Sequence, residues 1–171
     1  VRVAVLDTGI DTTHPALSGR LARSTSGAVL GRDFVDDDDD ASEAGSPADA
    51  GWGHGTHVAG LVVLAAPATQ LMPVRVLDAA GRGNVWVLAE ALLWAADPDG
   101  NPATDDGAHV INLSLGTTAP TKLLDAAIEL ITCKDDDADI DTSDPGFNDD
   151  RERCNLGRGV VVMAAAGNGG S

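Results

Sequence analysis

Aromatic residues are scarce in this chain of 171 residues, which has no tyrosine, two phenylalanines and three tryptophans. Hydrophobic residues nevertheless make up 43% of the sequence, so we expect a folded chain rather than a disordered one. Its core must then be built from alanine, valine, leucine and isoleucine. The length suits one domain with a core of its own and is too short for two ordinary domains.

Basic residues are also few, since 11 lysines and arginines stand against 27 acidic residues and give a net charge of −16. A surface this acidic repels phosphate backbones and anionic lipids, which argues against nucleic-acid and membrane-surface partners. The longest apolar run covers residues 58–66, includes Gly60 and is too short to span a bilayer. We therefore expect no membrane insertion.

Only two cysteines occur, Cys133 and Cys154, and they bracket an aspartate-rich segment. A disulfide between them would suit an exported protein, and two free thiols fit the sequence equally well. The chain has no charged-then-apolar leader and begins on valine. We expect both of its ends to be cut from a longer protein.

Strand-like apolar runs and helical patterns alternate along the chain. The predicted strands are residues 2–6, 71–77, 110–115 and 160–164, and the predicted helices are residues 54–66, 85–96 and 122–131. The strands are continuous apolar runs, which is typical of strands covered on both faces. The pattern predicts an α/β domain, a doubly wound and mostly parallel sheet with helices on both faces.

Three acidic segments, residues 33–49, 97–106 and 135–150, interrupt this pattern and are predicted to be loops. In the second segment oxygen-bearing side chains alternate, and the candidate calcium ligands are Asp97, Asp99, Asn101 and Asp105. The third segment repeats the alternation without the glycine and terminal glutamate of an EF-hand loop. A solvated acidic loop is the alternative for both segments.

Polar residues follow the predicted strands at the edge where such sheets bind ligands. Asp7 ends the first strand, and His54, between two glycines, opens the first helix. A carboxylate that orients an imidazole is half of a nucleophilic hydrolase, and a turn-forming aspartate is the alternative for Asp7. His57, one turn further along, is predicted to point inward. Asn168 ends the last strand and could donate to an oxyanion or simply form an Asn-Gly turn.

Five sequence blocks carry a resemblance to a known family. They are VAVLDTGIDTTHP from residue 3, GHGTHVAG from residue 53, MPVRVLDAAGRG from residue 72, VINLSLG from residue 110 and GVVVMAAAGN from residue 159. In this order, over nearly the whole chain, they resemble the subtilisin-like serine peptidases, the subtilases.

The resemblance implies a serine endopeptidase in which Asp7 orients His54, His54 deprotonates a serine and Asn168 helps to bind the oxyanion. It places a polypeptide substrate between two edges, formed by Arg82 and Gly83 and by Ser114, Leu115 and Gly116. It also makes Ala165, Ala166 and Gly167 one wall of the pocket for the residue before the cleaved bond. Because these residues are small, we expect a preference for large apolar side chains there. The chemistry needs no cofactor, the location implied is extracellular or cell-surface, and the family admits an N-terminal pro-segment as a further partner.

Three features depart from the family pattern, and one is the insertion bracketed by Cys133 and Cys154, to which we attach no activity. None of the serines lies in a Gly-Thr-Ser-Met-Ala-like context, so residues 1–171 are predicted to be an incomplete catalytic domain, truncated at its C-terminus. The nucleophile would lie beyond residue 171, and these residues alone would be inactive. The usual strong calcium site is not expected, because Ala16 follows Pro15 and the first helix runs directly into Pro67.

Two other functions compete with this interpretation. One is a protein without catalytic activity: a calcium-binding acidic module, which would account for the charge, or a pseudoprotease. The other is an aspartic protease, which Asp7-Thr8-Gly9 suggests and which would require an all-β fold.

Overall fold

A parallel sheet of five strands forms the centre of the protein in a computed structural model that describes residues 1–101, 103–117, 121–132 and 159–165. The strands are β1 (Arg2–Asp7), β2 (Arg32–Asp33), β3 (Gln70–Arg75), β4 (Val110–Leu113) and β5 (Val161–Ala164). The helices are α1 (His54–Ala65), α2 (Val85–Ala96) and α3 (Lys122–Thr132), with a short 3-10 helix, η1 (Ser18–Arg20). The strand order is β2-β3-β1-β4-β5, and every neighbouring pair is parallel.

The predicted α/β class is confirmed, and each predicted helix and strand is present. Helix α2 has the predicted bounds, and it begins where the Asn84 side chain accepts a hydrogen bond from the Trp86 N–H at 2.8 Å. Strand β3 ends two residues earlier than predicted, because the chain then turns to bond the carbonyl of Asp7. Strand β2 was not predicted, since it has only two residues and begins an acidic segment.

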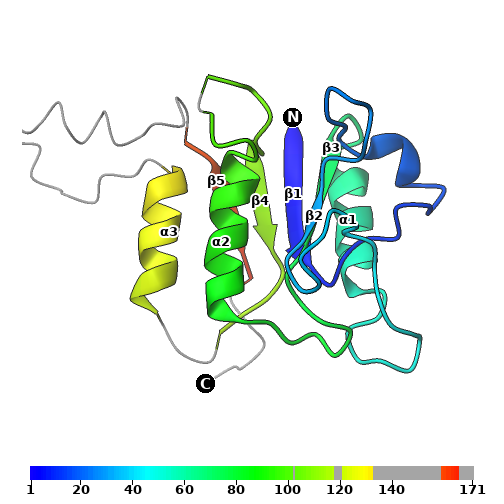
Figure 1. The fold of residues 1–171 in the computed structure, drawn as a ribbon. Helices are drawn as coiled ribbons and strands as arrows, with labels where there is room; N and C mark the ends of the chain where they lie inside the picture. Colours follow the sequence, from blue (N-terminus) through cyan, green and yellow to red (C-terminus); the bar gives the residue numbers. More distant parts are fainter. Residues whose placement is uncertain (102, 118–120, 133–158, 166–171) are drawn as a thin grey trace, which may run out of the picture.

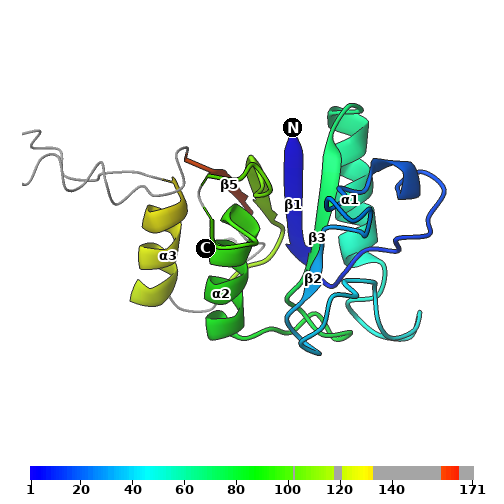
Figure 2. The same ribbon diagram turned by 45° about the horizontal axis from the view of Figure 1, so that its top comes forward.

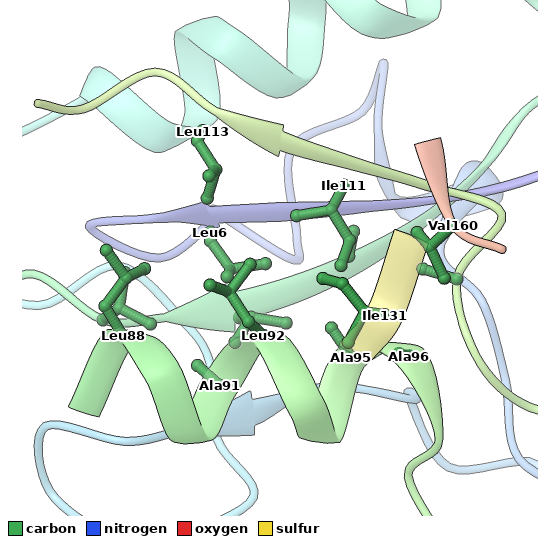
Figure 3. Packing of buried hydrophobic residues seen from close by; sticks show 14 of the residues in the cluster. Leu6, Leu88, Ala91, Leu92, Ala95, Ala96, Ile111, Leu113, Ile131 and Val160 are labelled. Atoms are coloured by element: carbon green, nitrogen blue, oxygen red, sulfur yellow. The ribbon is translucent and has the colours of Figure 1, made fainter. Parts of the chain in front are cut away.

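Helices cover both faces of the sheet (Figures 1 and 2). Alternate residues of β1 divide between two cores: Val3 and Val5 pack with α1, whereas Ala4 and Leu6 pack with α2 and α3. Figure 3 shows the larger core, in which one face of α2 and Ile131 of α3 meet the sheet. Helical residues at these positions are almost completely buried.

The connection through α1 has the opposite hand to the connections through α2 and α3. All three connections, β2-α1-β3, β3-α2-β4 and β4-α3-β5, cross the sheet in the same direction. Helix α1 nevertheless lies on the opposite face to α2 and α3 (Figure 1). Since parallel crossovers are nearly always right-handed, α1 occupies an unusual position, and its first residue is His54.

Strand β5 differs from the prediction that all strands are covered on both faces. Val162 packs against the larger core, but Val161 and Met163 on the other side are 55% and 59% exposed. Within the described part of the chain no helix is long and apolar enough to cross a membrane.

Candidate active site

The carboxylate of Asp7 lies at the carboxyl end of β1 and is completely buried. Its Oδ1 accepts a hydrogen bond from the backbone N–H of Thr8 at 2.7 Å. The Asp7 carbonyl accepts from the N–H groups of Val76 and Leu77 at 2.9 and 3.2 Å, which ties the end of β1 to the chain that leaves β3. The carboxylate is therefore held in one place by the sheet.

His54 is the first residue of α1, and its Nδ1 lies 2.7 Å from Asp7 Oδ1. The His54 side chain is 47% exposed, whereas that of Asp7 is 0% exposed. An ionised carboxylate can only accept a hydrogen bond, so Nδ1 is the donor and carries the proton. In the neutral ring Nε2 is then the atom that can accept a proton.

Two glycines allow α1 to begin this close to β1. Gly53 precedes His54 with φ of 79°, in the left-handed region that glycine adopts without strain. A Cβ on Gly55 would collide with the carbonyl oxygen of Gly9 and lie 3.1 Å from the Cβ of Asp7. The Gly-His-Gly sequence thus brings the imidazole to the buried carboxylate.

A pocket of about 630 Å³ opens beside His54. All five residues predicted to form the two substrate edges line it: Arg82, Gly83, Ser114, Leu115 and Gly116. Val85 and Leu88, from the start of α2, line the same pocket. The structure thus brings the candidate base and both predicted edges to one place.

Each edge is fixed by local contacts. The backbone groups of Asp78 and Arg82 bond at 2.8 Å, and the Asp78 carboxylate accepts from the Arg82 N–H at 2.9 Å. The opposite edge continues from β4, where the Ser114 hydroxyl donates to Asn112 Oδ1 at 3.0 Å. Ser114 therefore directs its proton to its own strand.

The predicted wall of the pocket is described only in part. Ala165 follows β5, and its N–H donates to the carbonyl of Leu113 at 3.0 Å. It lies beyond β4 and is not among the described residues that line the pocket. Ala166, Gly167 and Asn168 lie outside the described residues, as do Cys133 and Cys154.

The prediction that His57 points inward was wrong, because His57 is exposed. Val58 and Ala59 face the sheet in this turn of α1 and are buried. In the sequence an apolar run begins directly after His57, and only the contact with the sheet determines which side of the helix is buried.

The acidic loop after α2 brings three carboxylates together. One oxygen each of Asp97, Asp99 and Asp106 lies within 4.8 Å of the others, so the three could hold a metal ion. Burial raises the pKa of Asp97 although its carboxylate accepts the N–H of Asn101. Of the predicted carboxylate ligands, Asp105 is not in this group, which contains Asp106 instead. The side chain of Asn101, the remaining predicted ligand, accepts a hydrogen bond from the Ala103 N–H at 3.2 Å.

A buried ion pair was missed, because residues 33–49 were predicted to be a loop throughout. Asp33 belongs to β2, is 2% exposed and accepts from Arg75 Nη1 at 2.5 Å. Arg75 ends β3, beside Asp7 in the register of the sheet, and also bonds Asp36.

Glu43, from the same acidic segment, accepts hydrogen bonds from the start of α1 and was likewise not predicted. The sequence around Glu43 does not distinguish it from the other acidic residues of the segment.

Comparison with known proteins relates the chain to a protein family. The Subtilase family matches residues 1–171. The chain is 35% identical to a "Thermophilic serine proteinase" of Bacillus sp. (strain AK1) over 99% of its length, and 35% identical to "Subtilisin Savinase" of Lederbergia lenta over 100%. It covers 33% and 49% of those relatives, so it spans a third to a half of their length. It is also 36% identical over 126 residues to the "Minor extracellular protease Vpr" of Bacillus subtilis (strain 168), covering 69% of this chain and 14% of that protein.

The fold agrees with this sequence relationship. The crystal structure of a cold adapted subtilisin-like serine proteinase superposes with a TM-score of 0.56 at 30% identity, covering 75% of this chain and 41% of that one. The parallel α/β sheet also excludes the all-β fold that an aspartic protease would require. The chain belongs to the subtilase family.

Proposed function

We propose that this chain is part of a serine endopeptidase in which Asp7 orients His54 and His54 is the general base. The observation that carries the proposal is the 2.7 Å hydrogen bond between a buried carboxylate and a half-exposed imidazole at the rim of a pocket. Membership of a serine protease family supports it. Residues 1–171 would then form an incomplete catalytic domain.

The nucleophile in this proposal is a serine outside the described residues. Ser114 lines the pocket, but its hydroxyl donates to Asn112, and no hydrogen bond joins it to His54 in the part of the chain that the structure describes. We assign the role to a Gly-Thr-Ser segment that these 171 residues do not include. Without it these residues would not hydrolyse peptides.

The proposed reaction consists of proton transfers through His54 that accompany acyl transfer. His54 Nε2 takes the proton of the serine hydroxyl as the oxygen attacks the carbonyl carbon of the peptide bond. Asp7 stabilises the imidazolium that forms, and the amide of Asn168 donates to the oxyanion. His54 then gives the proton to the leaving amine, and water repeats the sequence to release the acid from the acyl-enzyme.

The substrate would lie as an extended strand between the two edges of the pocket. Arg82 and Gly83 of one edge and residues 114–116 of the other line this pocket, and an added strand would bond to their backbone groups. We assign the residue before the cleaved bond to the wall formed by Ala165, Ala166 and Gly167, and expect large apolar side chains to be preferred there. Equal cleavage after aspartate or lysine in a peptide library would contradict this assignment.

The setting of the activity follows from the relatives. The name of the Bacillus subtilis relative describes an extracellular protease, and the acidic surface suits an exported protein. We propose an extracellular or cell-surface location, with an N-terminal pro-segment as a partner during folding. Calcium bound by Asp97, Asp99 and Asp106 would be structural, because the reaction uses no metal.

Fluorophosphonate labelling of the full-length protein tests the proposal. The reagent forms a covalent bond with an activated serine, so we expect stoichiometric labelling that is abolished by His54→Ala. The control is His14→Ala, which changes an exposed histidine in a turn. A full-length protein that does not label would favour the acidic binding module or a pseudoprotease.

A further inference from the structure

The helix that carries His54 has little capping of its own. Its N-cap residue is Gly53, which has no side chain, and no acidic residue lies in its first turn. The first N–H groups of a helix need acceptors from elsewhere. Here the Gly53 N–H donates to Glu43 Oε1, and the Gly55 N–H donates to Thr8 Oγ1 at 3.1 Å.

Glu43 reaches the helix because its loop is held against the end of β1. The Ile10 N–H donates to the carbonyl of Ala41 at 3.1 Å. A Cβ on Gly9 would lie 2.7 Å from the carbonyl oxygen of Ser42 and 2.9 Å from the Glu43 nitrogen, so the two segments are in close backbone contact. The Glu43 side chain therefore starts from a fixed point beside the helix.

The Glu43 carboxylate also receives two threonine hydroxyls. Thr56 Oγ1 donates to Glu43 Oε2 at 2.9 Å and accepts the Asp11 N–H at 2.8 Å. Thr8 Oγ1 lies 3.5 Å from Glu43 Oε1 while it accepts the Gly55 N–H. An ionised carboxylate is an acceptor only, so it can serve both hydroxyls and the Gly53 N–H at once. A glutamine at this position could not, because half of its amide is a donor.

We propose that Glu43 is a positioning residue for His54. Its carboxylate joins β1, through Thr8, to the first turn of α1, and this link keeps His54 Nδ1 in bonding distance of Asp7 Oδ1. Its negative charge at the start of a helix also complements the helix dipole. The effect on catalysis rests on the proposed function of His54, whereas the effect on the hydrogen bond between His54 and Asp7 does not.

The experiment compares Glu43→Gln, Glu43→Asp and a control, Glu90→Gln, in the full-length protein. Glu90 lies exposed on α2, and its substitution removes the same charge. Two quantities are measured: kcat and KM on a peptide substrate, and the downfield proton NMR signal of the Nδ1–H that His54 shares with Asp7. The second readout needs no nucleophile, so it still tests Glu43 if the protein proves inactive.

We expect Glu43→Gln to lower kcat by about tenfold to a hundredfold, because small displacements of a catalytic group have effects of this size. KM should stay within about twofold of the wild-type value, and the downfield signal should broaden or vanish through exchange with water. Glu90→Gln should leave both readouts unchanged. Wild-type kcat and an unchanged signal in Glu43→Gln would overturn the proposal, as would a loss confined to KM.

If Glu43→Gln does not fold, Glu43→Asp tests the same proposal. Aspartate keeps the charge and is one methylene shorter, so it can reach only part of the same set of donors. A reduced kcat at unchanged KM in this variant supports the positioning role. Wild-type kcat together with a wild-type signal in Glu43→Asp would overturn it.

Discussion

Arg75→Met should destabilise the protein by leaving a buried carboxylate without its counter-charge. Arg75 is 5% exposed, and its Nη1 lies 2.5 Å from Asp33 Oδ2 and 2.6 Å from Asp36 Oδ2. Burial alone lowers the pKa of Arg75, but the hydrogen bonds to Asp36 and Asp33 outweigh it and raise the pKa. The guanidinium is therefore charged in the folded protein, and Asp33 depends on that charge.

The size of the destabilisation depends on the hydrogen bonds that Asp33 keeps in Arg75→Met. Breaking a buried pair by removing one partner costs about 3–5 kcal/mol. Asp33 Oδ1 would still accept the N–H groups of Val35 and Asp36 at 2.7 and 3.1 Å, which favours the lower end of this range. The Asp36 side chain is 64% exposed, so loss of its contact adds little. For 150–250 residues that unfold together, about 3 kcal/mol corresponds to a fall in Tm of roughly 6–12 °C.

The assay is denaturant unfolding followed by tryptophan fluorescence, in a His54→Ala background to prevent autolysis. The series adds Asp33→Asn and the double variant Arg75→Met/Asp33→Asn. The double variant should be more stable than Arg75→Met alone, because no charge is then left buried and unpaired. A loss below about 1 kcal/mol in Arg75→Met, or a double variant less stable than that single one, would refute this reasoning.

Three further predictions concern the site and the acidic loop. Asp7→Asn should lower kcat by about 10⁴-fold, because an amide can donate to Nδ1 and leave the proton on Nε2; wild-type kinetics on a peptide substrate would contradict it. Burial raises the pKa of Asp97, so the folded state binds this proton more tightly than the unfolded state and loses stability as pH rises through that pKa. In calcium-free buffer Asp97→Asn should therefore be more stable than the wild type at pH 7, by a margin that shrinks toward pH 3 in denaturant titrations. If Asp97, Asp99 and Asp106 hold calcium, the ion should raise Tm in the wild type and not in Asp99→Asn, whereas an unchanged wild-type Tm would exclude the site.

The sequence predicted well the elements whose limits depend on local chemistry. Helix α2 lies between Asn84, which caps it, and Pro98, and its bounds were predicted without error. Strand β2 was missed because its two residues carry no period that could be recognised. It pairs with the end of β3, where Arg75, 42 residues away along the chain, makes an ion pair with Asp33.

The residues of the candidate site also fall into two groups, those that the sequence could predict and those that it could not. Asp7 and His54 stand in motifs whose spacing is informative, so their meeting could be predicted. Glu43 lies in a segment crowded with acidic residues, and nothing local distinguishes it from its neighbours. What selects it is the path of the loop, set by the contact of Ala41 and Ser42 with the end of β1. Contacts between distant segments of this kind leave no trace in a single sequence.

The opposite hand of the β2-α1-β3 connection explains why the pocket has room. A connection of the usual hand would place α1 on the face that α2 and α3 already cover. Because α1 lies on the other face, the starts of α1 and α2 approach the carboxyl edge of the sheet from opposite sides (Figure 1). His54 from α1, and Val85 and Leu88 from α2, line the pocket there. The pocket forms between them. Gly55 makes this arrangement tight enough for chemistry, since any side chain there would push the first turn of α1, and His54 with it, away from Asp7.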